Sequence, residues 1–64
     1  MLSIDLKEAI DGKDRSPNFS VMLFRLLFKA DQINFIKLAP LYPIHAHMVL
    51  EWRRTGEILE GLEE

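Results

Sequence analysis

The sequence contains no cysteine, which excludes disulfides and thiolate metal sites. At 64 residues the chain is one domain at most. A domain of about 60 residues buries only ~60% of the surface that its unfolded chain exposes, so its stability is marginal. Chains of this size usually need a disulfide, a metal or a partner subunit. Association with another chain is therefore the stabilising device that we expect.

A strong net charge and a long apolar run are also absent. The formal charge of −2 is too small to direct the molecule toward nucleic acid. The longest apolar run covers residues 21–24 and ends at Arg25, whereas a membrane span needs about 18 uninterrupted apolar residues. The first residues are acidic where a signal peptide would be basic. We therefore expect a cytoplasmic protein with no membrane partner.

Residues suited to catalysis or to metal binding are scarce. The glycines are too far apart to form a phosphate-binding loop, and paired carboxylates occur only in the last eight residues. His45 and His47 are the only imidazoles, and at a spacing of two they diverge by about 200° on a helix, so they do not converge on one metal. The sequence therefore predicts no enzyme, no cofactor and no metal site.

Apolar residues make up 48% of the chain, and they recur with the helical period of 3.6 rather than in alternation. This pattern predicts an all-α fold, a compact bundle of three to four short helices that is homo-oligomeric. The whole chain, residues 1–64, is expected to be a single helical domain. Its expected parts are a short N-terminal helix and polar connector (1–15), a helical core (16–56) and a solvated acidic tail (57–64).

Capping residues give the expected helix boundaries. Ser3, Ser16 and Asp31 are candidate N-caps, with Pro17 and Pro43 each at a first helical position. Gly12 and Gly56 are suited to end helices, and a turn is expected at residues 40–42. The predicted helices cover residues 3–10, 17–30, 32–39 and 43–55.

The second predicted helix is apolar around most of its circumference. Asn18, Arg25, Lys29 and Gln32 form one narrow polar stripe on a helical wheel. A helix of this kind is buried nearly all round, and 64 residues offer little other protein to cover it. We therefore expect a homo-oligomer, with a dimer as the first expectation. The predicted interface residues are Phe19, Met22, Leu23, Phe24, Leu26, Leu27, Phe28, Ile44, Met48 and Trp52.

Basic and aromatic residues gather in the last two predicted helices and suit an anionic planar ligand. Arginine binds phosphate, and an aromatic ring stacks on a base. The candidate ligand-binding residues are Lys37, Tyr42, His45, Trp52, Arg53 and Arg54. The alternative is that Trp52 belongs to the core and that the arginines stabilise a helix C-terminus. For His45 the alternatives are a ligand contact and a buried histidine that is paired with a carbonyl.

Residues 18–56 carry a resemblance to a family. The shared positions are Asn18-Phe19, Leu26-Leu27, Lys29-Ala30-Asp31, Asn34, Leu38, Tyr42-Pro43, Trp52 and Gly56. In these positions the chain resembles small uncharacterised helical proteins of phages and prophages. The resemblance brings no catalytic residues. It implies a virus-encoded accessory protein that acts by binding, either to a host defence protein or to a signalling nucleotide.

Three functions remain open from the sequence. The first is a homo-oligomeric helical module that binds and inhibits a host defence factor. The second is an oligomer that sequesters an anionic small molecule, such as a nucleotide, at a subunit interface. The third is a small DNA-binding regulator, which the near-neutral charge and the prolines in the expected turn disfavour.

Overall fold

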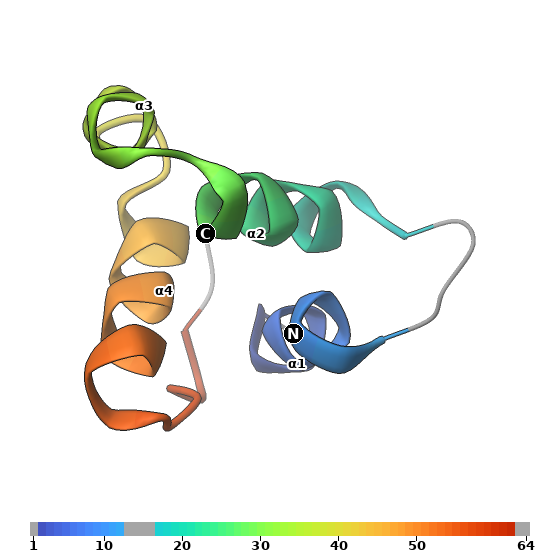
Figure 1. Cartoon of the computed structure of the whole chain (residues 1–64). Coiled ribbons are helices and arrows are strands. Elements are labelled where there is room, and N and C mark those ends of the chain that lie inside the picture. The colour runs from blue at the N-terminus through green and yellow to red at the C-terminus, as the bar shows by residue number, and fades with distance from the viewer. Residues whose placement is uncertain (1, 13–16, 63–64) are drawn as a thin grey trace.

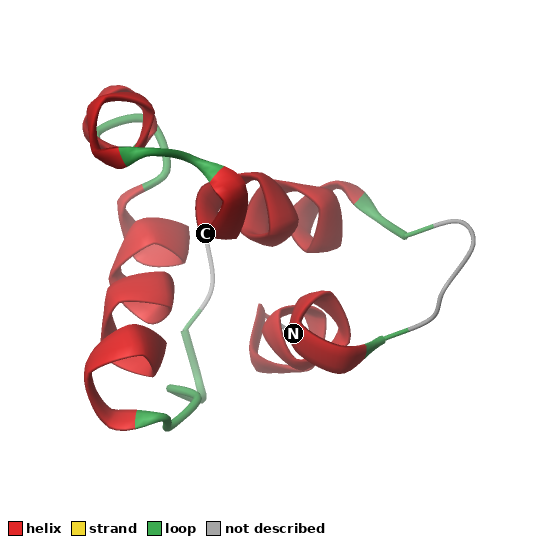
Figure 2. Cartoon of the chain, in the orientation of Figure 1, coloured by secondary structure: helices red, strands yellow, loops and turns green. Residues whose placement is uncertain are grey.

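Four helices account for most of the residues that the computed structural model describes, which are 2–12 and 17–62. They are α1 (Leu2–Asp11), α2 (Phe19–Lys29), α3 (Gln32–Leu38) and α4 (Pro43–Thr55). Those two ranges contain no strand (Figure 2). The all-α class and the number of helices expected from the sequence are confirmed.

The α2 helix is the centre of the arrangement. It packs chiefly against α1 and α4, and α3 projects at the end of α2 (Figure 1). The radius of gyration is 10.8 Å, close to the ~11 Å expected for a compact chain of this length. The core residues are Leu2, Leu6, Leu23, Phe24, Leu27, Phe35, Ala46, Met48 and Val49.

The inner half of α2 is covered by the chain itself. Val21, Leu23, Phe24 and Leu27 are buried against the neighbouring elements. The α1 helix supplies part of this cover through Leu6, which is fully buried, so this short helix docks rather than remaining loose. The expectation that the chain cannot shelter α2 is therefore wrong for this half of the helix.

Two of the predicted N-caps are corrected. The α2 helix begins after Asn18, whose side-chain Oδ1 accepts a hydrogen bond from the Val21 backbone N–H at 2.9 Å. The predicted cap Ser16 lies outside the described residues, and Pro17 precedes the cap instead of opening the helix. The other predicted cap, Ser3, is a buried residue inside α1, which begins one residue earlier.

The later boundaries follow local signals closely. Asp31 caps α3 by accepting a hydrogen bond from the Asn34 N–H at 2.8 Å, as expected. Pro43 opens α4, and Gly56 ends it with a φ of 75°, which favours glycine. Residues 39–42 form the turn between α3 and α4, one residue longer than predicted.

The segment that follows α4 turns back toward the core. In the view of Figure 1 it leaves the end of α4 and turns back between α4 and α1 (red). Ile58, Leu59 and Leu62 pack against the core cluster, whereas Glu57 and Glu60 are exposed. The description of residues 57–64 as a solvated tail is therefore wrong for its apolar side chains, which add cover to a small core.

Candidate functional site

One face of α2 carries exposed apolar side chains. Phe19, Met22 and Leu26 are 65%, 52% and 52% exposed, on the side opposite the buried residues of the helix. Their spacing of three and four places them in one row along the helix. We call these three residues the α2 stripe. Contact with another chain would remove the apolar surface of each side chain from water, so the stripe is the first candidate site.

The turn after α3 borders the α2 stripe. The Tyr42 ring lies 5.8 Å from the Phe19 ring, measured between centroids, in a tilted arrangement. At the other end of the stripe, Leu26 and Leu38 line a shared cavity of about 560 Å³ that also has Lys29 and Lys37 at its edge. Leu41, in the same turn, is 70% exposed.

The predicted interface residues divide into three groups. Phe19, Met22 and Leu26 form the exposed stripe, and Phe28, Ile44 and Trp52 are half-buried. The remaining four lie in the interior of the single chain, where they cannot contact a second folded copy. The interface prediction is therefore wrong for Leu23, Phe24, Leu27 and Met48.

The structure distributes the predicted ligand-binding residues over separate places. Trp52 and Arg53 line different cavities, and Lys37 lines a third. Tyr42 and His45 lie close together, with ring centroids 6.0 Å apart. The six side chains therefore form no single pocket of the described chain.

His45 is a core residue, which agrees with the second of its two interpretations, a buried histidine. Only 3% of the side chain is exposed, and its ring lies 4.8 Å from the Phe24 ring. Its Nε2 lies 3.2 Å from the Ser20 hydroxyl, so the partner at this nitrogen is a hydroxyl group rather than the expected carbonyl. This contact joins α2 to α4 in the interior and leaves His45 poorly placed for a ligand.

Arg53 and Arg54 already have partners within the chain. The Arg53 guanidinium donates to the carbonyl oxygens of Leu27 and Phe28 at 3.4 and 3.1 Å, in the last turn of α2. It also lies over the Phe28 and Phe35 rings, at 5.8 and 5.6 Å from their centroids. Arg54 is paired with Glu51 on its own helix. Arg53 thus joins three helices, a role that the sequence pattern did not indicate.

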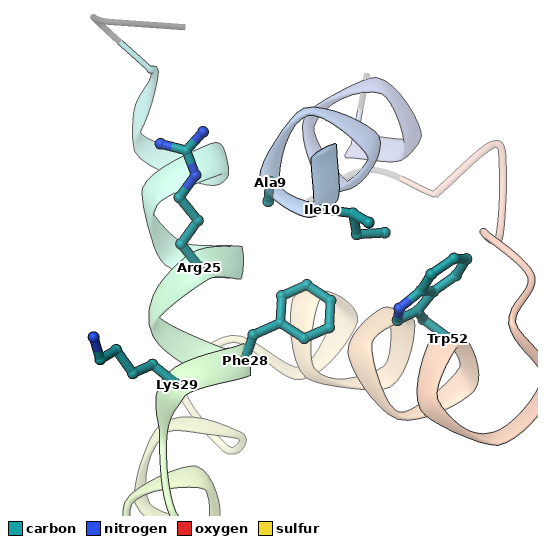
Figure 3. A pocket seen from close by; sticks show the side chains of 6 residues that line it. All are labelled: Ala9, Ile10, Arg25, Phe28, Lys29 and Trp52. Carbon is teal, nitrogen blue, oxygen red and sulfur yellow. The ribbon is translucent and has the colours of Figure 1, made fainter. Parts of the chain in front are cut away.

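A cavity of about 400 Å³ opens between α1, α2 and α4 (Figure 3). Phe28 from α2 and Trp52 from α4 lie on either side of it, with Ile10 of α1 above the space between them (Figure 3). Arg25 and Lys29, one turn apart on α2, complete the lining together with Ala9. Arg25 and Lys29 thus line the same cavity as Trp52, but their charged ends point away from Trp52 (Figure 3).

The described residues contain no group of three or more histidine, cysteine, aspartate or glutamate side chains that could hold a metal ion. Within the same part of the chain, none of the helices has the length and apolar character needed to cross a bilayer. Comparison with known proteins adds no functional assignment: no family model, curated protein or solved structure matches this chain.

Proposed function

We propose that this chain is a non-enzymatic helical interaction module that associates with a second copy of itself through the α2 stripe. The observation that carries the proposal is the row of Phe19, Met22 and Leu26, each more than half exposed on a helix whose other face is core. Burial of apolar surface is the main favourable contribution to association of this kind.

An antiparallel pairing of two α2 helices fits the charges at the two ends of the stripe. Lys29 is at the C-terminal end of α2, and Asp5 accepts a hydrogen bond from Asn18 at the N-terminal end, with 3.0 Å between Asn18 Nδ2 and Asp5 Oδ1. In an antiparallel pair each Lys29 approaches the acidic end of the other helix, and Met22 lies opposite Leu26. A parallel pair would instead bring like charges together.

The size of the stripe sets the expected strength of association. A standard interface buries about 800 Å² per partner, roughly a sixth of the 4536 Å² surface of this chain. Three apolar side chains with their polar neighbours cover less than this. We therefore expect a weak dimer with a dissociation constant on the order of tens of micromolar, populated according to the protein concentration.

A matched pair of variants tests whether the stripe is the interface. Leu26→Glu places a charge opposite Met22 of the second copy, whereas Ile33→Glu changes an exposed residue of α3 outside the stripe. We expect Leu26→Glu to weaken dimerisation at least tenfold in sedimentation equilibrium, and Ile33→Glu to leave it within about twofold. Circular dichroism checks that both variants remain helical. Equal dimerisation of the two variants would place the interface elsewhere.

The biological role that we propose follows the resemblance of residues 18–56 to phage and prophage proteins. In this proposal the dimer is an accessory protein that binds and inhibits a host defence factor in the host cytoplasm. Ile36 and Leu50, 60% and 51% exposed, flank a separate cavity of about 550 Å³ between α3 and α4. This second apolar surface stays available for a foreign protein when the α2 stripe is covered.

The two alternative functions have less support as first formulated. A nucleotide held at a subunit interface by Arg53 and Arg54 would have to displace their partners, the α2 carbonyl groups and Glu51. A DNA-binding surface built from Lys37, Arg53 and Arg54 meets the same difficulty. Neither alternative accounts for the exposed apolar row on α2.

A further inference from the structure

We propose that Met22 is a site of reversible oxidation and that its sulfoxide form prevents the α2 stripe from pairing with a second copy. This role rests on the self-association proposed above and adds to it a chemical modification that turns the association off. Three observations carry it: the exposure of Met22, the burial of Met48 and the place of Met22 in the stripe.

Methionine supplies all the sulfur of this chain, which has three methionines and no cysteine. Met22 is 52% exposed, whereas Met48 is fully buried among the core residues. Met1 lies outside the described residues. A thioether must meet its oxidant directly, so a hydroperoxide in water reaches Met22 in the folded chain and reaches Met48 only when the core opens.

The modification is the transfer of one oxygen atom from a hydroperoxide to the Met22 sulfur. A sulfur lone pair forms the S–O bond as the O–O bond breaks, and the proton of the transferred oxygen passes to the departing oxygen. Sulfur is oxidised, and the hydroperoxide is reduced to an alcohol, or to water when the oxidant is hydrogen peroxide. The product is methionine sulfoxide, which methionine sulfoxide reductases convert back to methionine.

A sulfoxide at Met22 places a polar oxygen in an otherwise apolar contact. Met22 lies between Phe19 and Leu26 in the α2 stripe, and in the antiparallel pair it lies opposite Leu26 of the second copy. A leucine side chain has no hydrogen-bond donor, so pairing would remove the sulfoxide oxygen from water without replacing its hydrogen bonds. Phe19 and Leu26 contain no sulfur, so Met22 alone makes the stripe sensitive to a mild oxidant.

Association and oxidation of Met22 oppose each other. The thioether is accessible in the free chain and covered in the dimer, and a dissociation constant on the order of tens of micromolar leaves a dilute chain mostly free. The effect is reciprocal, so the dimer that the sulfoxide weakens also protects Met22 from oxidant. The rate of Met22 oxidation should therefore fall as the chain concentration rises. In Leu26→Glu, which pairs poorly, the rate should not depend on concentration.

Hydrogen peroxide in excess tests the selectivity, with peptide mapping by mass spectrometry to follow each methionine separately. We expect Met22 to react about tenfold faster than Met48, or more, in a dilute sample. Raising the chain concentration from about 1 to about 200 µM should slow the reaction at Met22 by about threefold or more. Equal rates at Met22 and Met48 in the folded chain would overturn the proposal.

Sedimentation equilibrium of the oxidised chain tests the consequence. The matched control is Met22→Leu, which keeps the size and apolar character of the side chain without the sulfur. Peroxide should weaken the dimer of the unaltered chain by about tenfold or more, leave the dimer of Met22→Leu unchanged, and have its effect reversed by a methionine sulfoxide reductase. Circular dichroism checks that the oxidised chain remains helical.

The outcomes separate this proposal from the self-association on which it rests. An untreated chain that never dimerises would refute the self-association itself. A dimer that forms before treatment and survives oxidation of Met22 would overturn the role of Met22 alone. Loss of the Met22→Leu dimer after peroxide would likewise overturn it, because the sensitive group would then lie elsewhere in the chain.

Discussion

Arg53 shows how one side chain can contribute more to this fold than its place in the sequence indicates. Near the end of α4 it suits the helix dipole, but its guanidinium reaches the last carbonyl groups of α2 and lies over the rings of Phe28 and Phe35. Carbonyl groups at a helix end have no partner within the helix. Arg53 therefore caps α2 from a distance and holds the corner between α2, α3 and α4.

We predict that Arg53→Ala lowers the free energy of unfolding by about 1–2 kcal/mol, from lost hydrogen bonds and cation–π contacts. The matched control is Arg54→Ala, which removes an exposed pair with Glu51 and should cost less than about 0.5 kcal/mol. Urea unfolding followed by circular dichroism measures both values. Equal destabilisation by the two variants would show that the contacts of Arg53 contribute no more than a surface charge.

At the scale of the helices, the sequence predicted a helix boundary correctly where a capping residue next to that boundary determines it. Asp31, Pro43 and Gly56 act within a few residues of the boundary that they set, and each was predicted in its role. The start of α2 was placed two residues too early because Pro17 suits a first helical position. Asn18 is the cap instead, and its side chain also donates to Asp5 of α1, a contact that depends on how α1 docks.

The candidate site was less predictable than the helices for the same reason. Arg25 and Lys29 were recognised as polar positions of α2, but that they line one cavity with Trp52 depends on the packing of three helices. The exposed row was included in a longer interface list, because periodicity shows that α2 is apolar nearly all round without showing which side its own chain covers. Leu23 and Leu26 look alike in the sequence, yet one is core and the other is 52% exposed.

The orientation of the paired helices has its own test, because the chain lacks cysteine and an introduced thiol is the only one present. We prepare Met22→Cys and Leu26→Cys separately and oxidise each alone and in an equal mixture. In the antiparallel pair position 22 lies opposite position 26, so the mixture should give the most disulfide-linked product. Electrophoresis without reductant measures the yield. Strongest crosslinking of Met22→Cys with itself would instead indicate a parallel pair.

At the scale of the whole molecule, a chain of 64 residues covers one half of its central helix and leaves the other half to water. The α1 helix, the α4 helix and the apolar residues of the returning segment all pack on the same core. The large apolar residues left outside include the α2 stripe, Ile33, Ile36, Leu41 and Leu50. We infer that the fold of one copy forms by itself and that association uses what remains exposed.

The most direct test of self-association is the mass of the unaltered chain by sedimentation equilibrium between about 1 and about 200 µM, a range that brackets the expected dissociation constant. We predict that the weight-average mass rises with concentration from 7.5 kDa toward twice that value. A mass that stays at 7.5 kDa up to the highest concentration would contradict the account, because the α2 stripe would then remain exposed to water without a second copy.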